Sequence, residues 1–67
     1  MTVNDLLNLM ALRDKVLITG YESGDTYYDG RVEDVPSAVK AMTPRLIDAT
    51  ADDYFGYDAF VQIEVDE

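Results

Sequence analysis

Three carboxylates and three aromatic rings lie together in the segment 51–58, which reads ADDYFGYD. Paired carboxylates such as Asp52 and Asp53 can act as general acid and base, or they can ligate a divalent cation. Neighbouring strand residues point apart, and in a loop both groups are hydrated, so neither gains the buried environment that catalysis requires. The spacing also lacks the D-x-[DN]-x-[DN]-G pattern of a calcium loop. We therefore predict no enzymatic activity, no cofactor and no dedicated metal site.

The amino-acid composition excludes several kinds of catalytic and metal site and indicates the charge of a partner. The chain has 67 residues and contains neither Cys nor His, which excludes thiolate and imidazole zinc ligands and any Ser–His or Cys–His nucleophile. Its net charge is −9, and residues 46–67 hold seven acids and no base, whereas residues 1–45 hold seven acids and five bases. Such a charge repels nucleic acids and anionic membranes and attracts a basic protein. We therefore expect a protein partner, with no direct nucleic-acid binding and no membrane association.

The acidic half of the chain is the candidate binding surface. Tyrosine offers a large contact area with a polar tip, and its ring suits Lys and Arg through cation–π contacts. Carboxylates on alternate strand residues stand roughly 6–7 Å apart, about the spacing of phosphates along one nucleic-acid strand. The alternative is hydrated surface charge around rings that belong to the core. The candidate partner-binding residues are Asp48, Asp52, Asp53, Tyr54, Tyr57, Asp58, Glu64 and Asp66.

A helix over residues 2–12 is predicted to begin the chain. Thr2 and Asp5 have the spacing of a capping box, and apolar residues then recur at i, i+3, i+4 and i+7. The segments 15–21 (KVLITGY) and 26–32 (TYYDGRV) flank the polar turn ESGD, a pattern typical of a hairpin.

Inside the second of these strands, Gly30 indicates a bulge or the close approach of another backbone. Tyr27 and Tyr28 are consecutive, so their side chains are expected on opposite faces of the sheet.

The second half of the chain is expected to contain a helix and two strands, with no internal sequence repeat. Asp34 is expected to cap a helix over residues 35–42, which Pro44 ends. Strands are predicted over residues 45–50 and 57–65, the latter with strict alternation of apolar and polar residues. The outline is α-β-β-α-β-β. We therefore predict a single α+β domain (residues 1–67) with an antiparallel four-stranded sheet covered by the N-terminal helix.

The segments MTVNDLLNLM, KVLITGYESGDTYYDGRVEDVP and DDYFGYDAFVQIEVDE resemble small uncharacterised acidic proteins of Gram-positive bacteria, their phages and other mobile elements. The shared features are an N-terminal helix, a return strand with Tyr28-x-Gly30-x-Val32, and an acidic-Val-Pro link at Asp34. The start VNDLL and the Arg-Asp pair before the first strand are also similar to type II-A anti-CRISPR proteins, small acidic α+β domains that cover DNA-binding surfaces of Cas9. Neither resemblance implies a catalytic residue.

The leading hypothesis is a phage or mobile-element accessory protein that inhibits a host defence protein, such as a nuclease, by occupying its basic groove. The start of the chain lacks a signal peptide's basic region and long apolar run, so we expect it in the cytoplasm of the bacterial host. The alternative is an oligomer that sequesters a nucleotide-like ligand between Tyr-rich strands, or a structural assembly factor. The target and the oligomeric state, including a homo-oligomer, stay open from the sequence.

Overall fold

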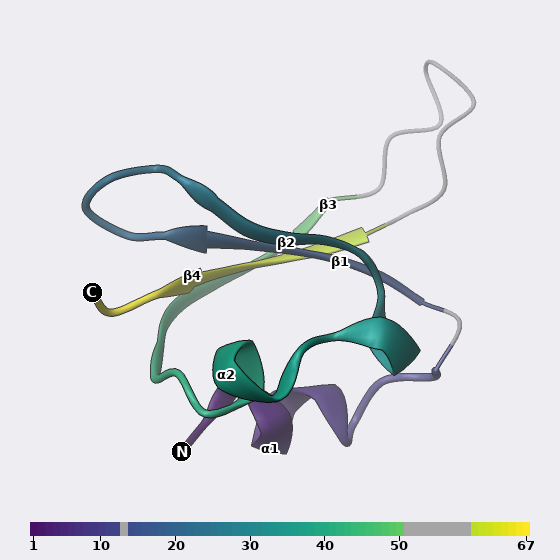
Figure 1. Ribbon diagram of the computed structural model, residues 1–67. Helices are drawn as coiled ribbons and strands as arrows, with labels where there is room; N and C mark the ends of the chain where they lie inside the picture. Colours follow the sequence, from purple (N-terminus) through teal and green to yellow (C-terminus); the bar gives the residue numbers. More distant parts are fainter. Residues whose placement is uncertain (13, 51–59) are drawn as a thin grey trace.

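The protein is a small α+β domain in the computed structural model, which describes residues 1–12, 14–50 and 60–67. The order of helices and strands is the predicted one, with a short 3-10 turn added after the second strand (Figure 1). The elements are α1 (Val3–Leu7), β1 (Lys15–Gly20), β2 (Thr26–Arg31), η1 (Val32–Asp34), α2 (Ser37–Lys40), β3 (Pro44–Thr50) and β4 (Phe60–Val65).

The four strands form one mixed sheet in the order β2-β1-β4-β3. β1 pairs antiparallel with β2, and β3 pairs antiparallel with β4, but the central strands β1 and β4 run parallel. The prediction of a purely antiparallel sheet is therefore wrong. Each hairpin pairs locally, but the connection through η1 and α2 returns the chain so that β4 lies beside β1 in the same direction.

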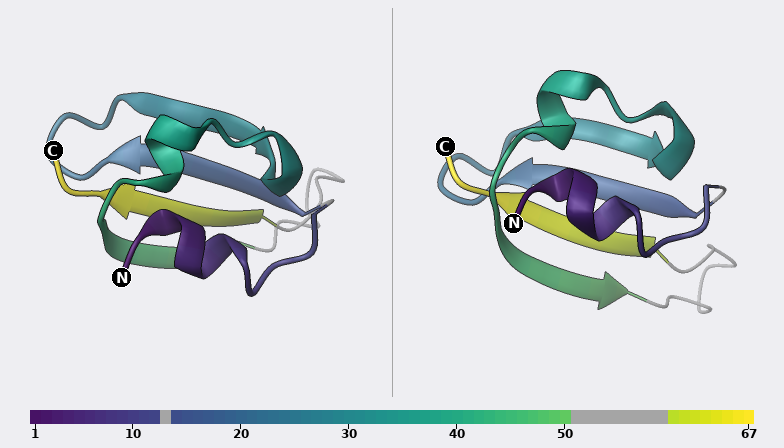
Figure 2. Two further views of the ribbon diagram at one scale, coloured as in Figure 1. Left: turned by 60° about the horizontal axis from the view of Figure 1, so that its bottom comes forward. Right: turned by 90° about the horizontal axis from the view of Figure 1, so that it is seen from below.

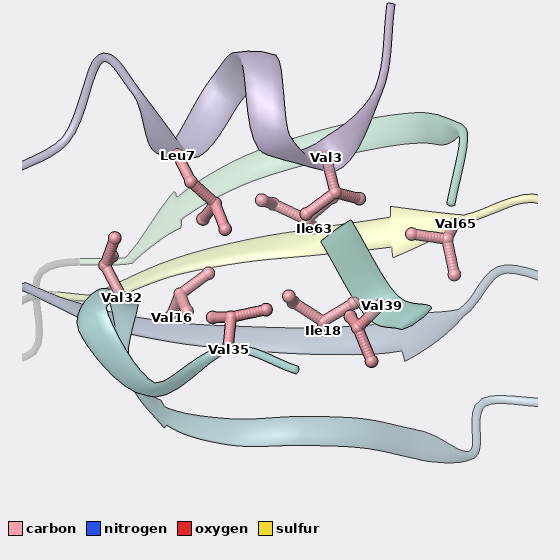
Figure 3. Close-up of a cluster of buried hydrophobic side chains, with 9 residues drawn as sticks. All are labelled: Val3, Leu7, Val16, Ile18, Val32, Val35, Val39, Ile63 and Val65. Carbon is pink, nitrogen blue, oxygen red and sulfur yellow. The ribbon is translucent and has the colours of Figure 1, made fainter. Parts of the chain in front are cut away.

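Both helices lie on the same side of this sheet (Figure 2). The centre of the core is the register pair Ile18 and Ile63, on β1 and β4, both of which are completely buried. Buried side chains from α1, from η1 and the residue after it, and from α2 pack over this pair (Figure 3). Among the residues that the structure describes, the buried hydrophobic ones are Val3, Leu7, Val16, Ile18, Val32, Val35, Val39, Ile63 and Val65.

The first helix is shorter than predicted, although its start is as expected. The Thr2 N–H donates to Asp5 Oδ2 at 2.8 Å and the Asp5 N–H donates to Thr2 Oγ1 at 3.4 Å, which confirms the capping box. α1 ends at Leu7, and Leu9 and Leu12 are 85% and 65% exposed. The Leu9 N–H donates to the Leu6 carbonyl three residues back, a bond of the 3-10 type that tightens the last turn of a helix.

The second helix also departs from expectation. α2 begins after Pro36 without a side-chain cap, and Asp34 belongs to η1 instead of capping the helix. Val35 has φ −62° and ψ 126°, an extended conformation. Pro36 explains this, because a proline ring clashes with a preceding residue in the helical conformation.

The strand β2 contains a bulge, located at Tyr27 and not at Gly30. Thr26 pairs with Thr19 and Tyr28 pairs with Ile18, which leaves Tyr27 as the extra residue. Tyr27 and Tyr28 were expected on opposite faces because side chains alternate along a regular strand. At a bulge this alternation is broken, so it does not determine the face of the Tyr27 side chain. At Gly30 the close neighbour is a side chain, because a Cβ there would lie 2.7 Å from the Tyr28 hydroxyl oxygen.

Candidate functional site

One half of the sheet face opposite the helices brings together two of the predicted site residues. Ile63 and Val65 point into the core, so Glu64 between them and Gln62 before Ile63 point away from the helices. On β3, Asp48 is the register partner of Gln62, and Leu46 is the partner of Glu64. We call these four residues the β3–β4 patch: Leu46, Asp48, Gln62 and Glu64.

The β3–β4 patch combines negative charge with apolar surface. Asp48 is exposed, Glu64 is half-buried, and Leu46 leaves 45% of its surface exposed. Neither carboxylate makes a hydrogen bond or an ion pair with another of the described residues. Gln62 is held in place, because its Nε2 donates to Thr19 Oγ1 at 3.3 Å. The patch can therefore offer two carboxylates and an apolar side chain to a partner.

Two bases lie on the other half of the same face, formed by β1 and β2. Lys15 lies beside the buried Val16 and so points away from the helices, and its register partner on β2 is Arg31. Both bases are exposed. Asp29, the register partner of Leu17, is also exposed on this half of the face, which therefore carries both signs of charge, whereas the β3–β4 patch carries only negative charge.

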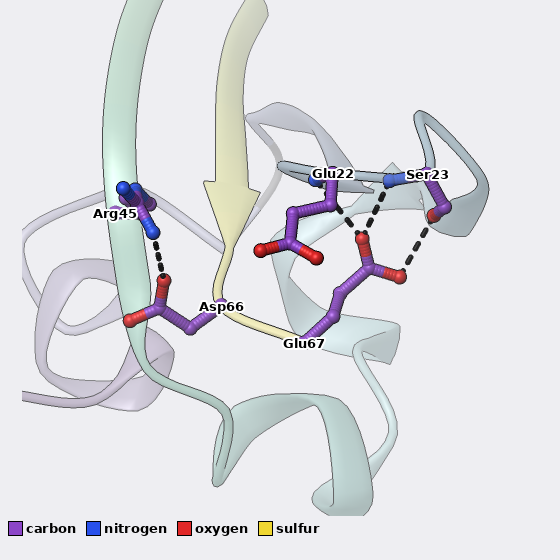
Figure 4. A network of polar contacts seen from close by, with 5 residues as sticks. All are labelled: Glu22, Ser23, Arg45, Asp66 and Glu67. Atoms are coloured by element: carbon purple, nitrogen blue, oxygen red, sulfur yellow. Dashed lines mark hydrogen bonds and ion pairs between the residues drawn. The ribbon is translucent and has the colours of Figure 1, made fainter.

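Asp66, a predicted partner-binding residue, is engaged within the chain. Its Oδ1 accepts a hydrogen bond from Nη1 of Arg45 at 3.2 Å, and both side chains are about half exposed (Figure 4). The Arg45 guanidinium also lies 4.2 Å from the centre of the Tyr21 ring, within cation–π range. Asp66 therefore has its charge balanced by Arg45, unlike the carboxylates of the β3–β4 patch.

Glu67 is also engaged, in an arrangement that the sequence did not reveal. Its carboxylate accepts hydrogen bonds from the Glu22 N–H (3.1 Å), the Ser23 N–H (2.8 Å) and the Ser23 hydroxyl (2.7 Å) (Figure 4). It also accepts a hydrogen bond from the Tyr27 hydroxyl at 2.7 Å. These donors lower the pKa of Glu67 from 4.5 to about 2, with the Ser23 N–H contributing most and the Tyr27 hydroxyl next. We call this arrangement the Glu67 clamp.

The β1–β2 turn shapes the clamp. Gly24 has φ +73°, a left-handed conformation that glycine adopts without strain, and its N–H donates to the Gly20 carbonyl at 2.9 Å. A Cβ at Gly20 would overlap the Glu67 carboxylate, so the absence of a side chain there makes room for the clamp. The sequence signal was a glycine at the end of a strand, which does not indicate what fills the space.

The other predicted site residues, Asp52, Asp53, Tyr54, Tyr57 and Asp58, lie outside the described residues. Within the described part of the chain, no three acidic side chains gather into a group that could hold a metal ion. No helix in residues 1–12, 14–50 and 60–67 has the length and apolar character needed to cross a membrane. No protein-family model, curated protein sequence or solved structure matches this chain.

Proposed function

We propose that this protein acts by stoichiometric binding to a basic surface of another protein, and that the β3–β4 patch is part of its contact area. The observation in support is that Asp48 and Glu64 lie on one face of the sheet beside exposed Leu46, with no described residue balancing their charge. An apolar centre with a charged surround is the usual construction of a protein interface. The sheet fixes the backbone at both residues, so binding a base restricts only the freedom of the two side chains.

The proposed partner is a basic groove that normally holds nucleic acid. The net charge of −9 steers the chain toward such a groove and away from nucleic acid itself. The segment that connects β3 to β4 adds Asp52, Asp53 and Asp58 to the same part of the sequence, together with Tyr54 and Tyr57.

The proposed biological role is inhibition of a host defence nuclease by a phage or mobile-element protein in the bacterial cytoplasm. The resemblance to type II-A anti-CRISPR proteins makes a Cas9–guide RNA complex the first target to test. Binding of this kind involves no catalysis, so inhibition should reach its limit at a fixed molar ratio.

A matched pair of double variants tests the proposal. Asp48→Asn with Glu64→Gln removes the two patch charges, whereas Asp34→Asn with Glu33→Gln removes two exposed charges from η1. We expect the first pair to weaken inhibition of DNA binding by Cas9–guide RNA and the second pair to leave it nearly unchanged. Inhibition should also weaken steeply as salt rises, because exposed charges are screened.

Two outcomes separate the parts of the proposal. Equal losses from both double variants would show that total charge, and not the β3–β4 patch, attracts the partner. No binding to any Cas9–guide complex, with retained salt-sensitive binding to other nucleases, would show that the target class was chosen wrongly.

A further inference from the structure

The donors of the Glu67 clamp are arranged in the pattern that a carboxylate requires. Oε1 of Glu67 accepts from the N–H groups of Glu22 and Ser23 (Figure 4). Oε2 accepts from the hydroxyls of Ser23 and Tyr27. An ionised carboxylate has two oxygens with about four lone-pair positions, so two donors for each oxygen satisfy it completely. A halide has a single centre, and a phosphate has further oxygens that these four donors would leave without a partner.

The β1–β2 turn keeps its shape through hydrogen bonds that do not involve Glu67. The Gly20 N–H donates to the Asp25 carbonyl at 2.9 Å, and the Gly24 N–H donates to the Gly20 carbonyl at 2.9 Å. Ser23 Oγ accepts from the Asp25 N–H at 3.1 Å, which fixes the position of this hydroxyl. A carboxylate can therefore bind to the turn without having to order it first.

The site has room for a carboxylate group and is open to solvent. Gly20 has no side chain, and a Cβ there would overlap the Glu67 carboxylate. Ser23 and Glu67 are exposed, and Tyr27 is 40% exposed. Glu67 follows β4, which ends at Val65, so releasing its side chain breaks no pairing between strands. Glu67 can therefore leave the site while the sheet stays intact.

We propose that the β1–β2 turn is a carboxylate-binding site, and that Glu67 is its intramolecular ligand. A carboxylate of another molecule would bind to the same four donors once Glu67 has left them. Glu67 competes at a high effective concentration because it belongs to the same chain. Glu22 and Asp25 add negative charge to the turn, so a free carboxylate binds weakly. This inference goes beyond the proposed function and does not depend on it, because the turn lies outside the β3–β4 patch.

Acetate binding to three proteins tests the site. Glu67→Ala empties it, and Gly20→Ala in the same background fills the space without removing a donor. Sodium acetate is titrated at an ionic strength held constant with sodium chloride, and the amide NMR signals of Glu22 and Ser23 are followed. We expect saturable shifts in Glu67→Ala, an apparent affinity at least about tenfold weaker in the unmodified chain, where Glu67 competes, and no saturable shift in the double variant.

Two results of this titration would overturn the inference. Shifts that do not saturate in Glu67→Ala would mean that the four donors do not form a site without Glu67. Equal shifts in Glu67→Ala and in the filled double variant would mean that acetate acts on the chain elsewhere.

Sodium phosphate at the same ionic strength distinguishes recognition of a carboxylate from a general attraction of anions. We expect phosphate to shift the Glu22 and Ser23 signals of Glu67→Ala clearly less than acetate does, because it is not matched to two pairs of donors and carries more negative charge. Equal responses to phosphate and acetate would overturn the assignment of the ligand as a carboxylate.

Glu67→Gln provides a second test that does not require the site to be empty. Its neutral amide keeps the size of the side chain and competes less strongly than a carboxylate, because charged acceptors form the stronger hydrogen bonds. A ligand that binds the folded protein raises its unfolding temperature. Acetate should therefore raise the unfolding temperature of Glu67→Gln more than that of the unmodified chain, relative to chloride. Equal changes in both proteins would contradict exchange at this site.

Discussion

The carboxylate of Glu67 occupies the space where a side chain of Gly20 would stand, 47 residues earlier in the sequence. The Glu67 carboxylate therefore packs against the β1–β2 hairpin, where it accepts two hydrogen bonds from backbone N–H groups and two from hydroxyl groups. The clamp explains how a strongly acidic chain tolerates a carboxylate at this position, because fixed donors replace the water that would otherwise hydrate it.

Gly20→Ala is expected to destabilise the protein, because the new Cβ displaces the Glu67 carboxylate from its donors. In a Glu67→Ala background the same change should instead be neutral or stabilising by about 0.5–1 kcal/mol, since alanine loses less backbone freedom than glycine on folding. Urea unfolding of the four proteins in this double-mutant cycle measures the coupling. Additive effects would mean that the two residues do not interact in solution.

Tyr27→Phe removes one hydroxyl donor from the clamp and should raise the pKa of Glu67 toward its ordinary value. The pKa of Tyr27 itself is raised, chiefly because its hydroxyl donates to the Glu67 carboxylate. An NMR titration of Glu67 follows the first effect directly. Tyr21→Phe is the matched control, because the Tyr21 ring contacts Arg45 and its hydroxyl makes no hydrogen bond with another described residue. A Glu67 titration that is identical in both variants would rule out the Tyr27 hydrogen bond.

The clamp should make stability depend on pH in the acid range. Glu67 has a pKa of about 2 when folded and an ordinary value of 4.5, so the unfolded chain takes up its proton first as pH falls. The stabilisation is therefore fully present above about pH 5 and is lost progressively toward pH 2. Thermal unfolding of the unmodified chain and Glu67→Gln should differ most near neutral pH and converge at pH 2. A difference that does not change with pH would contradict this account.

Ile63→Ala should unfold much of the population, because removing a fully buried aliphatic side chain costs about 2–5 kcal/mol. A domain of this length has a total stability of only about 3–10 kcal/mol. Ile47→Ala is the matched control, since Ile47 is the register partner of Ile63 but is half exposed. Urea denaturation at low protein concentration should show a clearly smaller loss for Ile47→Ala. Equal losses would indicate that Ile47 is covered in solution.

Asp66→Asn should change stability by no more than about 1 kcal/mol, because the ion pair with Arg45 is about half exposed and screened by water. The same substitution leaves Arg45 without its carboxylate partner. Binding to a basic protein should then weaken because a negative charge is lost and Arg45 is no longer balanced, and chemical denaturation run alongside would show whether folding is affected. A loss of several kcal/mol would mean that this pair is far more shielded than its exposure indicates.

Local patterns in the sequence predicted local structure well. The Thr2 and Asp5 capping box forms as expected, and the alternation around Ile63 correctly separates core residues from those on the other face. The extent of α1 was overestimated, because an apolar spacing that includes Leu9 does not reveal that the chain must turn toward β1. The mixed sheet was missed because the β1–β4 pairing is set by the connection between hairpins and not by the residues of either strand.

In the candidate site, the sequence indicated which acidic residues to consider but not the contacts that Asp66 and Glu67 make. Asp48 and Glu64 were chosen from the charge of the region, and the register of β3 against β4 places them on one face. The partners of Asp66 and Glu67 lie 21 and 40–45 residues away in the sequence, at Arg45 and in the β1–β2 hairpin. Such contacts depend on the completed tertiary structure, and a sequence pattern of a few residues does not contain them.

β4 lies in the middle of the sheet although it follows the other three described strands in the sequence, and this order affects folding during synthesis. β1 and β4 are 45 residues apart in register, so the middle of the sheet cannot assemble on the ribosome until β4 has emerged. Until then, Val16 and Ile18 have no neighbour on one side and are available to chaperones or to aggregation. Pairing over so long a stretch of chain also favours slow folding for a domain of this size.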